Sequence, residues 1–176
     1  MNLDLFEIGN WAKDQHRNVN QRYGENNDLP YAYHLDMVRN VSNIAWTHLP
    51  INMHDIMFAA CYCHDLIEDA RLTYNDVAKV TGAEVADIVY ALTQEKGKTR
   101  HERQSDKYYE GIRNTPIATY VKLCDRIANT TYAKSERSRM FDIYKNEYDN
   151  FKIKLYDATD NACAILWRHL DNLYES

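Results

Sequence analysis

Four titratable side chains lie close together in the segment CHDLIEDA, residues 63–70 of a chain of 176 residues. His64 falls on the apolar face of a predicted helix, and Asp65 is its neighbour. Glu68 and Asp69 follow four residues later and share that face one turn on if the helix continues. Carboxylates this close would repel one another in a cleft, whereas a bound divalent cation would keep them ionised. The segment therefore predicts a metal site.

Two further candidate ligands, His34 and Asp125, stand elsewhere in the chain. His34 lies near the start of a predicted helix that Pro30 opens. Asp125 lies on a largely apolar predicted helix, where a charged residue is rare unless it is paired or coordinating. Two imidazoles and two carboxylates suit Mn²⁺, Fe²⁺, Zn²⁺, Co²⁺ or Ni²⁺ better than Mg²⁺ or Ca²⁺, which prefer oxygen ligands alone. Such a set leaves positions free for a water and a phosphate oxygen, as metal-assisted hydrolysis requires.

The helices that must position these side chains are predicted from the spacing of apolar residues. It predicts helices over residues 5–17, 31–47 and 53–67, the last with Asn52 as its N-cap. The polar residues 21–29 read as a loop between the first two helices. Candidate ligands therefore come from separate helices that must pack against one another.

Capping signals mark the remaining helices. Thr73 starts a capping-box pattern, and Gly82 is the expected stop of the short helix that follows. A further helix is predicted over residues 83–92, and Thr115 with Pro116 is typical of a helix start.

The fold class expected from these patterns is all-α, with roughly eight helices. Residues 142–174 also show helical spacing and are predicted to form one or two C-terminal helices. Neither a linker nor a repeat divides the chain, so residues 1–176 are expected to form a single domain.

The order His, His-Asp, Asp is the ligand signature of the HD phosphohydrolases, which this chain resembles. Within that superfamily it is most similar to the hydrolase half of the RelA/SpoT family and to the stand-alone small alarmone hydrolases. The resemblance covers about residues 8–135. It is carried by PYAYH at residues 30–34, HDLIED at 64–69 and KLCDRIAN at 122–129.

This resemblance implies a metal-dependent removal of the 3′-pyrophosphate from ppGpp and pppGpp, with the fold called an HD-domain helical bundle. In the family the metal is manganese, and the residues at the matching positions are His34, His64, Asp65 and Asp125. Glu68 and Asp69 match the pair that positions and activates the attacking water. Asn129 matches a nucleotide contact, and Arg22 matches an arginine that packs against the base.

Cations near these motifs could neutralise phosphate charge. Lys122 is one, and a basic stretch adds Lys96, Lys98, Arg100 and Arg103. The chain departs from the family at Tyr23, where lysine is usual, and at Leu35, where proline is usual. The segment between His16 and Pro30 also differs in length. These changes leave the ligand set intact and concern the pocket for guanine and pyrophosphate.

Two alternatives share the same ligand set. One is an HD-type 5′-nucleotidase or (d)NTP triphosphohydrolase; Glu68, Asp69 and Asn129 favour the alarmone hydrolase over it, whereas Tyr23 weakens the alarmone assignment. The other is a non-catalytic nucleotide sensor, which the intact pair Glu68 and Asp69 argues against.

Net charge and the length of apolar stretches limit the classes of binding partner that we expect. A formal net charge of −5 disfavours nucleic-acid binding. No stretch approaches the roughly 18 apolar residues of a membrane span, and the N-terminus lacks a signal pattern, so a cytoplasmic protein is expected. The expected partner is a small nucleotide substrate. The C-terminal helices could also form a homo-oligomer interface. The cysteines read as reduced thiols: Cys61, Cys63, Cys124 and Cys163.

Overall fold

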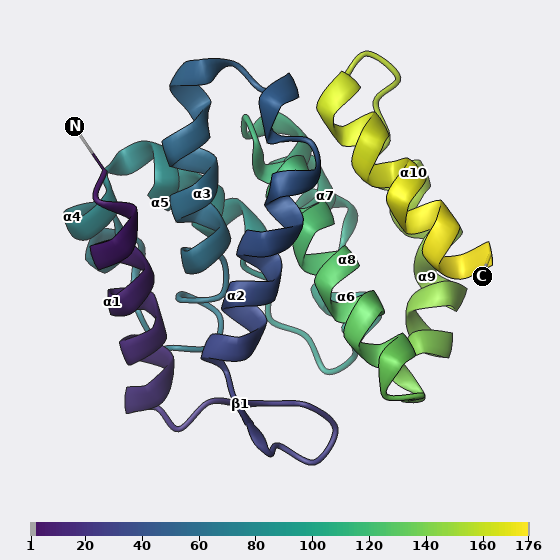
Figure 1. Ribbon diagram of the computed structural model, residues 1–176, viewed down its shortest axis with the longest axis horizontal. Coiled ribbons are helices and arrows are strands. Elements are labelled where there is room, and N and C mark those ends of the chain that lie inside the picture. Colours follow the sequence, from purple (N-terminus) through teal and green to yellow (C-terminus); the bar gives the residue numbers. More distant parts are fainter. Residues whose placement is uncertain (1–2, 176) are drawn as a thin grey trace.

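A computed structural model describes residues 3–175, and helices dominate this part of the chain (Figure 1). The α-helices are α1 (Leu5–Asn18), α2 (Ala32–Val41), α3 (His54–Cys63), α4 (Tyr74–Thr81), α5 (Ala83–Leu92), α6 (Arg100–Arg103), α7 (Asp106–Asn114), α8 (Ala118–Ser135), α9 (Met140–Leu155) and α10 (Asn161–Glu175). The 3-10 helices are η1 (Ser42–Ile44), η2 (Trp46–His48) and η3 (Ile51–Met53). Strands β1 (Arg22–Tyr23) and β2 (Leu29–Pro30) form a small antiparallel hairpin. The predicted all-α fold is confirmed.

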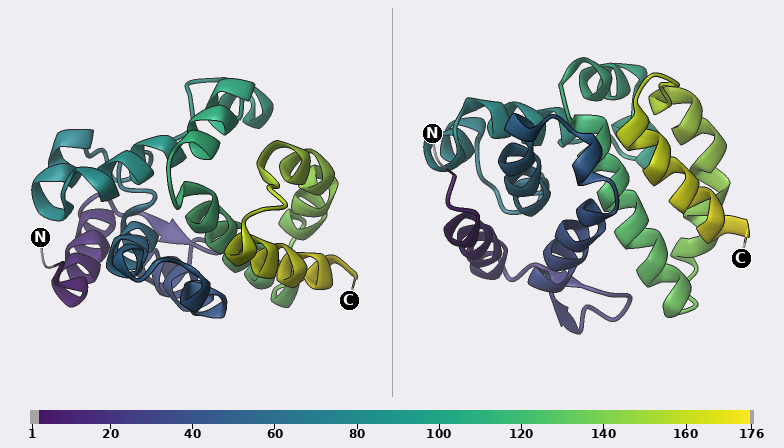
Figure 2. Two further views of the ribbon diagram at one scale, coloured as in Figure 1. Left: turned by 90° about the horizontal axis from the view of Figure 1, so that it is seen from above. Right: turned by 45° about the horizontal axis from the view of Figure 1, so that its top comes forward.

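Helix α8 is the centre of the fold. It packs against α2, α3, α5, α7, α9 and α10, and α9 and α10 lie on its far side from α1 (Figure 2). Because neighbours surround it, buried residues occur on nearly every side of this helix. They include Lys122, Asp125 and Arg126, so three charged side chains enter the interior on one element. Buried charges require partners.

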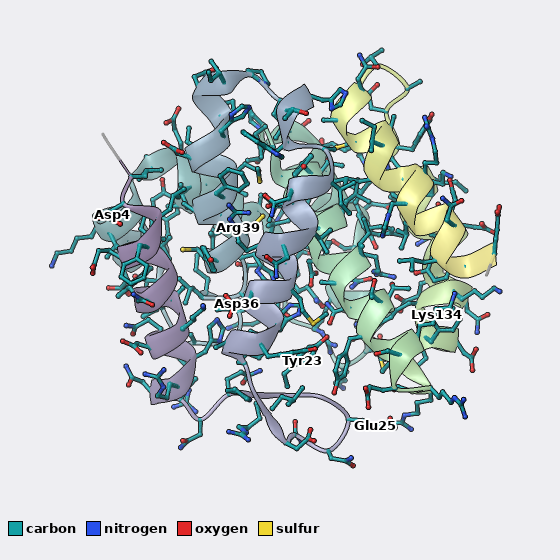
Figure 3. The ribbon with its side chains drawn as sticks, viewed as in Figure 1. Asp4, Tyr23, Glu25, Asp36, Arg39 and Lys134 are labelled. Carbon is teal, nitrogen blue, oxygen red and sulfur yellow. The ribbon has the colours of Figure 1, made fainter. Side chains whose placement is uncertain are left out.

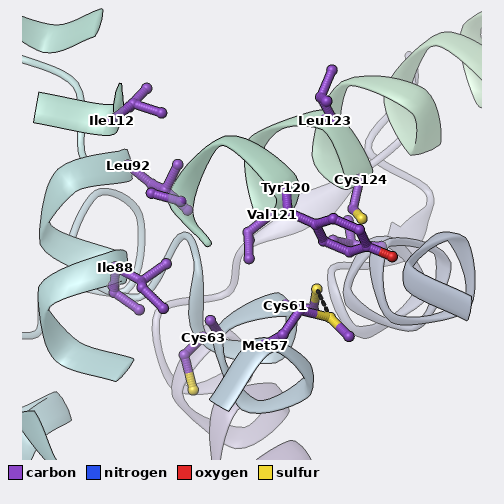
Figure 4. Close-up of a cluster of buried hydrophobic side chains, with 14 of the residues drawn as sticks. Met57, Cys61, Cys63, Ile88, Leu92, Ile112, Tyr120, Val121, Leu123 and Cys124 are labelled. Carbon is purple, nitrogen blue, oxygen red and sulfur yellow. Dashed lines mark hydrogen bonds between the residues drawn. The ribbon is translucent and has the colours of Figure 1, made fainter. Parts of the chain in front are cut away.

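The apolar core lies where α3, α5 and α8 meet. Met57 and Cys61 of α3 face Tyr120 and Cys124 of α8, as the close-up in Figure 4 shows. Burial of such side chains is the main favourable contribution to folding, at about 1.5–3 kcal/mol for each large one. The four cysteines are buried free thiols, in agreement with the prediction.

Two local predictions around the His-Asp motif are wrong. Helix α3 ends at Cys63 instead of continuing to residue 67, and the chain then turns. Two helical hydrogen bonds persist beyond the end: the Asp69 amide donates to the Asp65 carbonyl at 2.8 Å, and the Ala70 amide donates to the Leu66 carbonyl at 3.2 Å. The predicted cap Asn52 lies within η3, and Met53 precedes α3 without a side-chain cap.

The predicted helix over residues 31–47 is also too long. Helix α2 ends at Val41, and the chain continues as η1 and η2. Further along, α8 begins at Ala118 after Ile117, which has a left-handed φ of 69°, and not at the Thr115-Pro116 signal. Helix α7 was not predicted at all.

Other helix boundaries agree with those predicted from the sequence. The first predicted helix corresponds to α1. Thr73 forms a capping box with Asp76 at the start of α4, and Gly82 ends that helix at a φ of 88°. The C-terminal prediction over residues 142–174 corresponds to α9 and α10. In residues 3–175, no helix has the length and apolar character needed to span a bilayer.

Candidate metal centre and active site

The four predicted ligands converge from three elements. His34 comes from the first turn of α2, His64 and Asp65 from the end of α3, and Asp125 from the middle of α8. The Nε2 atoms of the two histidines lie 3.3 Å apart. Asp65 Oδ2 lies 2.9 Å from His64 Nε2, and Asp125 Oδ1 lies 3.3 Å from His34 Nε2. Donor atoms of His34, His64 and Asp125 all fall within 4.8 Å of one another.

Neighbouring groups orient these donors. The Nδ1 atom of His64 lies 3.0 Å from the Cys61 carbonyl, so it carries the proton and leaves Nε2 as a lone-pair donor. The Tyr31 hydroxyl donates to Asp65. Lys122 Nζ and Asn129 Nδ2 donate to the two oxygens of Asp125, at 2.8 and 2.6 Å. Each carboxylate is therefore held in one position.

The electrostatics of this cluster fit a divalent cation. Burial alone would lower the pKa of His64, but the Asp65 and Asp125 carboxylates outweigh it and raise that pKa well above its ordinary value. Burial would raise the pKa of Asp125, but Lys122 and the two imidazoles hold it well below its usual range. Buried imidazole nitrogens thus meet at a point where positive charge is strongly favoured. A divalent cation with mixed nitrogen and oxygen ligands meets that demand.

The predicted catalytic pair lies beside the cluster. Glu68 accepts a hydrogen bond from the backbone amide of Gln94 at 3.0 Å, and Asp69 accepts one from Gln21 Nε2 at 3.3 Å. Burial, with help from the Asp65 and Glu68 carboxylates, raises the pKa of Asp69 to about 7. A carboxylate with this pKa can take up a proton near neutral pH.

A cavity of about 240 Å³ joins these groups. It brings together three of the candidate ligands, His34, Asp65 and Asp125, with Glu68 and Asp69; the buried His64 does not line it. Its lining residues are Tyr31, His34, Asp65, Glu68, Asp69, Gln94, Arg100, Gln104, Lys122, Asp125, Arg126, Asn129 and Tyr144. The arrangement can bind an anionic group next to a metal and a carboxylate base.

Several of these lining residues were missed from the sequence. Arg126 carried a usable signal, because it is a charged residue inside a largely apolar helix, next to Asp125. Tyr144 carried none, since it lies on α9 outside the region of the family motifs. Of the predicted basic stretch, Arg100 reaches the cavity, whereas Lys96, Lys98 and Arg103 do not line it.

The predicted substrate contacts line two different cavities. Lys122 and Asn129 line the metal cavity. Arg22 lies in a neighbouring pocket of about 310 Å³, which shares Asn129 and Tyr144 with that cavity. Its guanidinium donates to the carbonyls of Asn27 and Asp28 in the hairpin.

Tyr23 stands at the border of the metal cluster, near one end of α2 (Figure 3). Its ring stacks on that of His34 at a centroid distance of 4.8 Å. Its hydroxyl donates to Asn129 Oδ1 at 3.0 Å. The residue that replaces the usual lysine of the family therefore contacts both a candidate ligand and a candidate nucleotide contact.

Comparisons with known proteins find relatives that are named as hydrolases. No family model matches the chain. The chain is 27% identical over 157 residues to the guanosine-3′,5′-bis(diphosphate) 3′-pyrophosphohydrolase MESH1 of Drosophila melanogaster, covering 84% of each protein. It is 30% identical over 127 residues to MESH1 of Danio rerio and 28% over 125 residues to that of Homo sapiens; both alignments cover 71% of this chain and 66% of the relative.

A solved structure shares the fold. It is described as a metazoan ortholog of SpoT that hydrolyses ppGpp and plays a role in starvation responses. The TM-score is 0.73 at 20% sequence identity, over 99% of this chain and 96% of the other. The likeness therefore extends through α9 and α10, beyond the motifs.

Proposed function

We propose that this chain, an HD-type hydrolase related to the MESH1 proteins, removes the 3′-pyrophosphate of ppGpp or of a closely related nucleotide. One observation carries the proposal. The candidate metal cluster and the pair Glu68 and Asp69 open onto a single cavity, together with Asn129 and three cationic side chains. This is the set of groups that hydrolysis of a phosphate ester at a metal requires.

His34, His64, Asp65 and Asp125 would hold the metal, and we propose Mn²⁺ in that role. When bound, it supplies Lewis-acid activation of a water and of a phosphoryl oxygen. Both imidazoles are almost fully buried, at 1% and 2% exposure, so they are positioned before any ligand arrives.

The chain's own residues supply the proton transfer and the orientation. Asp69 takes a proton from the attacking water, since its pKa near 7 leaves it half ionised at neutral pH. Glu68, fixed by the Gln94 amide, orients that water. The water oxygen forms a bond to the phosphorus, the bond from that phosphorus to the ribose 3′ oxygen breaks, and the proton taken up by Asp69 passes to the 3′ oxygen, which leaves as a hydroxyl.

A second candidate function is hydrolysis of another nucleotide by the same site, as in an HD-type 5′-nucleotidase or (d)NTP triphosphohydrolase. Tyr23 favours it, because a neutral phenol occupies the place of a phosphate-binding lysine. A sensor without turnover is disfavoured, since Glu68 and Asp69 both line the cavity.

The test is release of pyrophosphate from ppGpp by the Mn²⁺-loaded protein. We expect Asp125→Ala to lower the rate at least ~100-fold, because it removes a proposed ligand and leaves Lys122 unpaired. Asp149→Ala, an exposed change on α9, is the matched control and should keep the activity. A panel of ppGpp, (d)NTPs and (d)NMPs separates the two candidate functions. Turnover of none of them, with nucleotide still bound, would support a sensor.

We further propose that residues 1–176 form a single domain. Helices α9 and α10 pack on α8, and Tyr144 of α9 lines the metal cavity. A cytoplasmic location and the choice between monomer and homo-oligomer stay predictions from the sequence.

A further inference from the structure

Glu147 of α9 contacts two arginines from different elements. Its Oε1 lies 2.6 Å from Arg100 Nε of α6, and its Oε2 lies 3.2 Å from Arg126 Nη1 of α8. Both arginines line the metal cavity, whereas Glu147 does not. A single carboxylate from outside the cavity thus neutralises part of the positive charge that faces into it.

Arg126 is held firmly in this arrangement. Its residue is 3% exposed, and its guanidinium lies over the rings of Tyr144 and Phe151, at 4.9 and 4.4 Å from their centroids. Its Nη1 and the facing Glu147 Oε2 are close enough for an ion pair but not aligned for a hydrogen bond. A buried cation in a cavity therefore has a donor without an acceptor, which is costly unless a ligand supplies one.

Arg100 is held more loosely. Its side chain is 34% exposed, and it belongs to a helix of four residues between α5 and α7. Its guanidinium lies 5.6 Å from the Tyr144 ring centroid, on the same aromatic side chain as Arg126. Tyr144 therefore lies close to both cations, and Arg100 is the more exposed of the two.

We propose that Arg100 and Arg126 form an anion subsite for a phosphate group of the substrate that is not bound at the metal, and that Glu147 is the internal carboxylate this phosphate displaces. The inference rests on the proposed function, since it assigns the subsite to a nucleotide that carries more than one phosphate group. Guanidinium groups suit this role because they bind phosphate oxygens through paired N–H donors.

Glu147 then sets the affinity of the site. In the free protein its carboxylate pairs with two cations that would otherwise attract any small anion. A bound phosphate must first replace it, so weakly bound anions do not occupy the subsite. Removing this competing charge should raise anion affinity, because one negative charge leaves the neighbourhood of the ligand and Arg126 stays packed against the rings of Tyr144 and Phe151.

The first test measures binding of inorganic pyrophosphate to the full-length, Mn²⁺-loaded protein by calorimetry. We expect Glu147→Gln to bind pyrophosphate roughly 3- to 10-fold more tightly than the wild type, as expected for a partly screened charge. The matched control is Asp106→Asn. It removes a carboxylate of α7 that pairs with Lys154 of α9, the helix that also carries Glu147, and Asp106 does not line the cavity. This control should leave the affinity unchanged.

The second test combines two changes. Arg100→Gln should weaken pyrophosphate binding, and the double variant Arg100→Gln/Glu147→Gln should lose most of the gain seen with Glu147→Gln alone. A purely structural role of Glu147 predicts no such dependence on Arg100. Because Arg100 is partly exposed, this variant should fold, and thermal unfolding checks that it does.

Affinity in Glu147→Gln that is equal to or below that of the wild type would overturn the proposal, as would failure of both proteins to bind pyrophosphate. Neither outcome depends on turnover, so the result is independent of whether ppGpp is the substrate. If ppGpp is hydrolysed, Glu147→Gln should lower KM and leave kcat nearly unchanged, because the change acts on binding.

Discussion

Asp69 shows at the residue scale how the fold prepares a side chain for chemistry. It is half-buried, and burial next to the carboxylates of Asp65 and Glu68 raises its pKa to about 7. An exposed aspartate, with a pKa near 4, would be a weaker base at the pH of the cell. The same dense negative charge explains why a cation belongs in the cluster next to it.

We expect Asp69→Asn to lower kcat roughly 100- to 10,000-fold, because the amide cannot take a proton from the water. In the wild type, kcat/KM should rise with pH through about 7, since only the ionised carboxylate is a base and it forms above its pKa. A pH–rate profile checks both points. The control variant Gln21→Ala removes only the side-chain hydrogen bond to Asp69. Its kcat/KM should still rise with pH. An unchanged kcat in Asp69→Asn would remove this residue from the reaction.

Tyr23 is the residue-scale feature that bears on substrate choice. Tyr23→Lys should lower KM for ppGpp roughly 3- to 10-fold, because it adds a cation beside Asn129 at the edge of the cavity. Tyr23→Phe is the matched variant, since it keeps the ring stacked on His34 and adds no charge. Steady-state kinetics on ppGpp and on a nucleoside monophosphate compare the two. A KM for ppGpp that rises in Tyr23→Lys would show that the phenol itself serves the substrate.

At the scale of elements, two helix ends and the middle of α8 place the functional groups. His64 and Asp65 stand where α3 stops, so the chain can turn and direct Glu68 and Asp69 into the cavity. Asp125 and Asn129 stand one turn apart in α8 and share one face, which joins a candidate ligand to a candidate substrate contact.

Helix α4 offers a test of local stability away from this site. Thr73→Ala should lower the free energy of unfolding by about 1 kcal/mol, because it removes the side chain that caps the first turn. Thr73→Ser keeps the hydroxyl and should restore most of the loss. Denaturant unfolding measures both, and the activity should not change because α4 contributes no residue to the cavity. Equal losses in the two variants would mean that the threonine methyl group, not the cap, matters.

At the scale of the whole molecule, α8 connects the metal cluster to the C-terminal helices. One of its faces carries Asp125 towards α2 and α3, and Arg126 points to Tyr144 and Glu147 of α9. The far helices thus reach the cavity through a shared central element.

Leu166→Ala tests whether α10 belongs to the same folding unit. Leu166 is fully buried, so the change should lower the free energy of unfolding by about 2–5 kcal/mol. Unfolding should remain a single transition by fluorescence and by circular dichroism. The comparison is Leu173→Ala, at a half-buried position on the same helix. It should lower the free energy of unfolding by less than Leu166→Ala does. Two separate transitions would contradict a single domain.

The sequence by itself determined the helical fold class, most helix positions and the candidate ligand set. These properties depend on local signals: apolar spacing, the cap at Thr73, the glycine at residue 82 and the order of histidines and aspartates. The structure then brought His34, His64, Asp65 and Asp125 within a few ångströms of one another, as that order had suggested.

Tertiary structure alone decided the rest. The stacking of Tyr23 on His34 and the pairing of Glu147 with Arg100 and Arg126 join residues from different elements. Such contacts depend on how whole helices pack, and no pattern within one helix encodes them. The left-handed Ile117 at the start of α8 is a similar case. Packing of α8 against its many neighbours overrides the local Thr-Pro signal, because the burial of a whole helix outweighs one favourable cap.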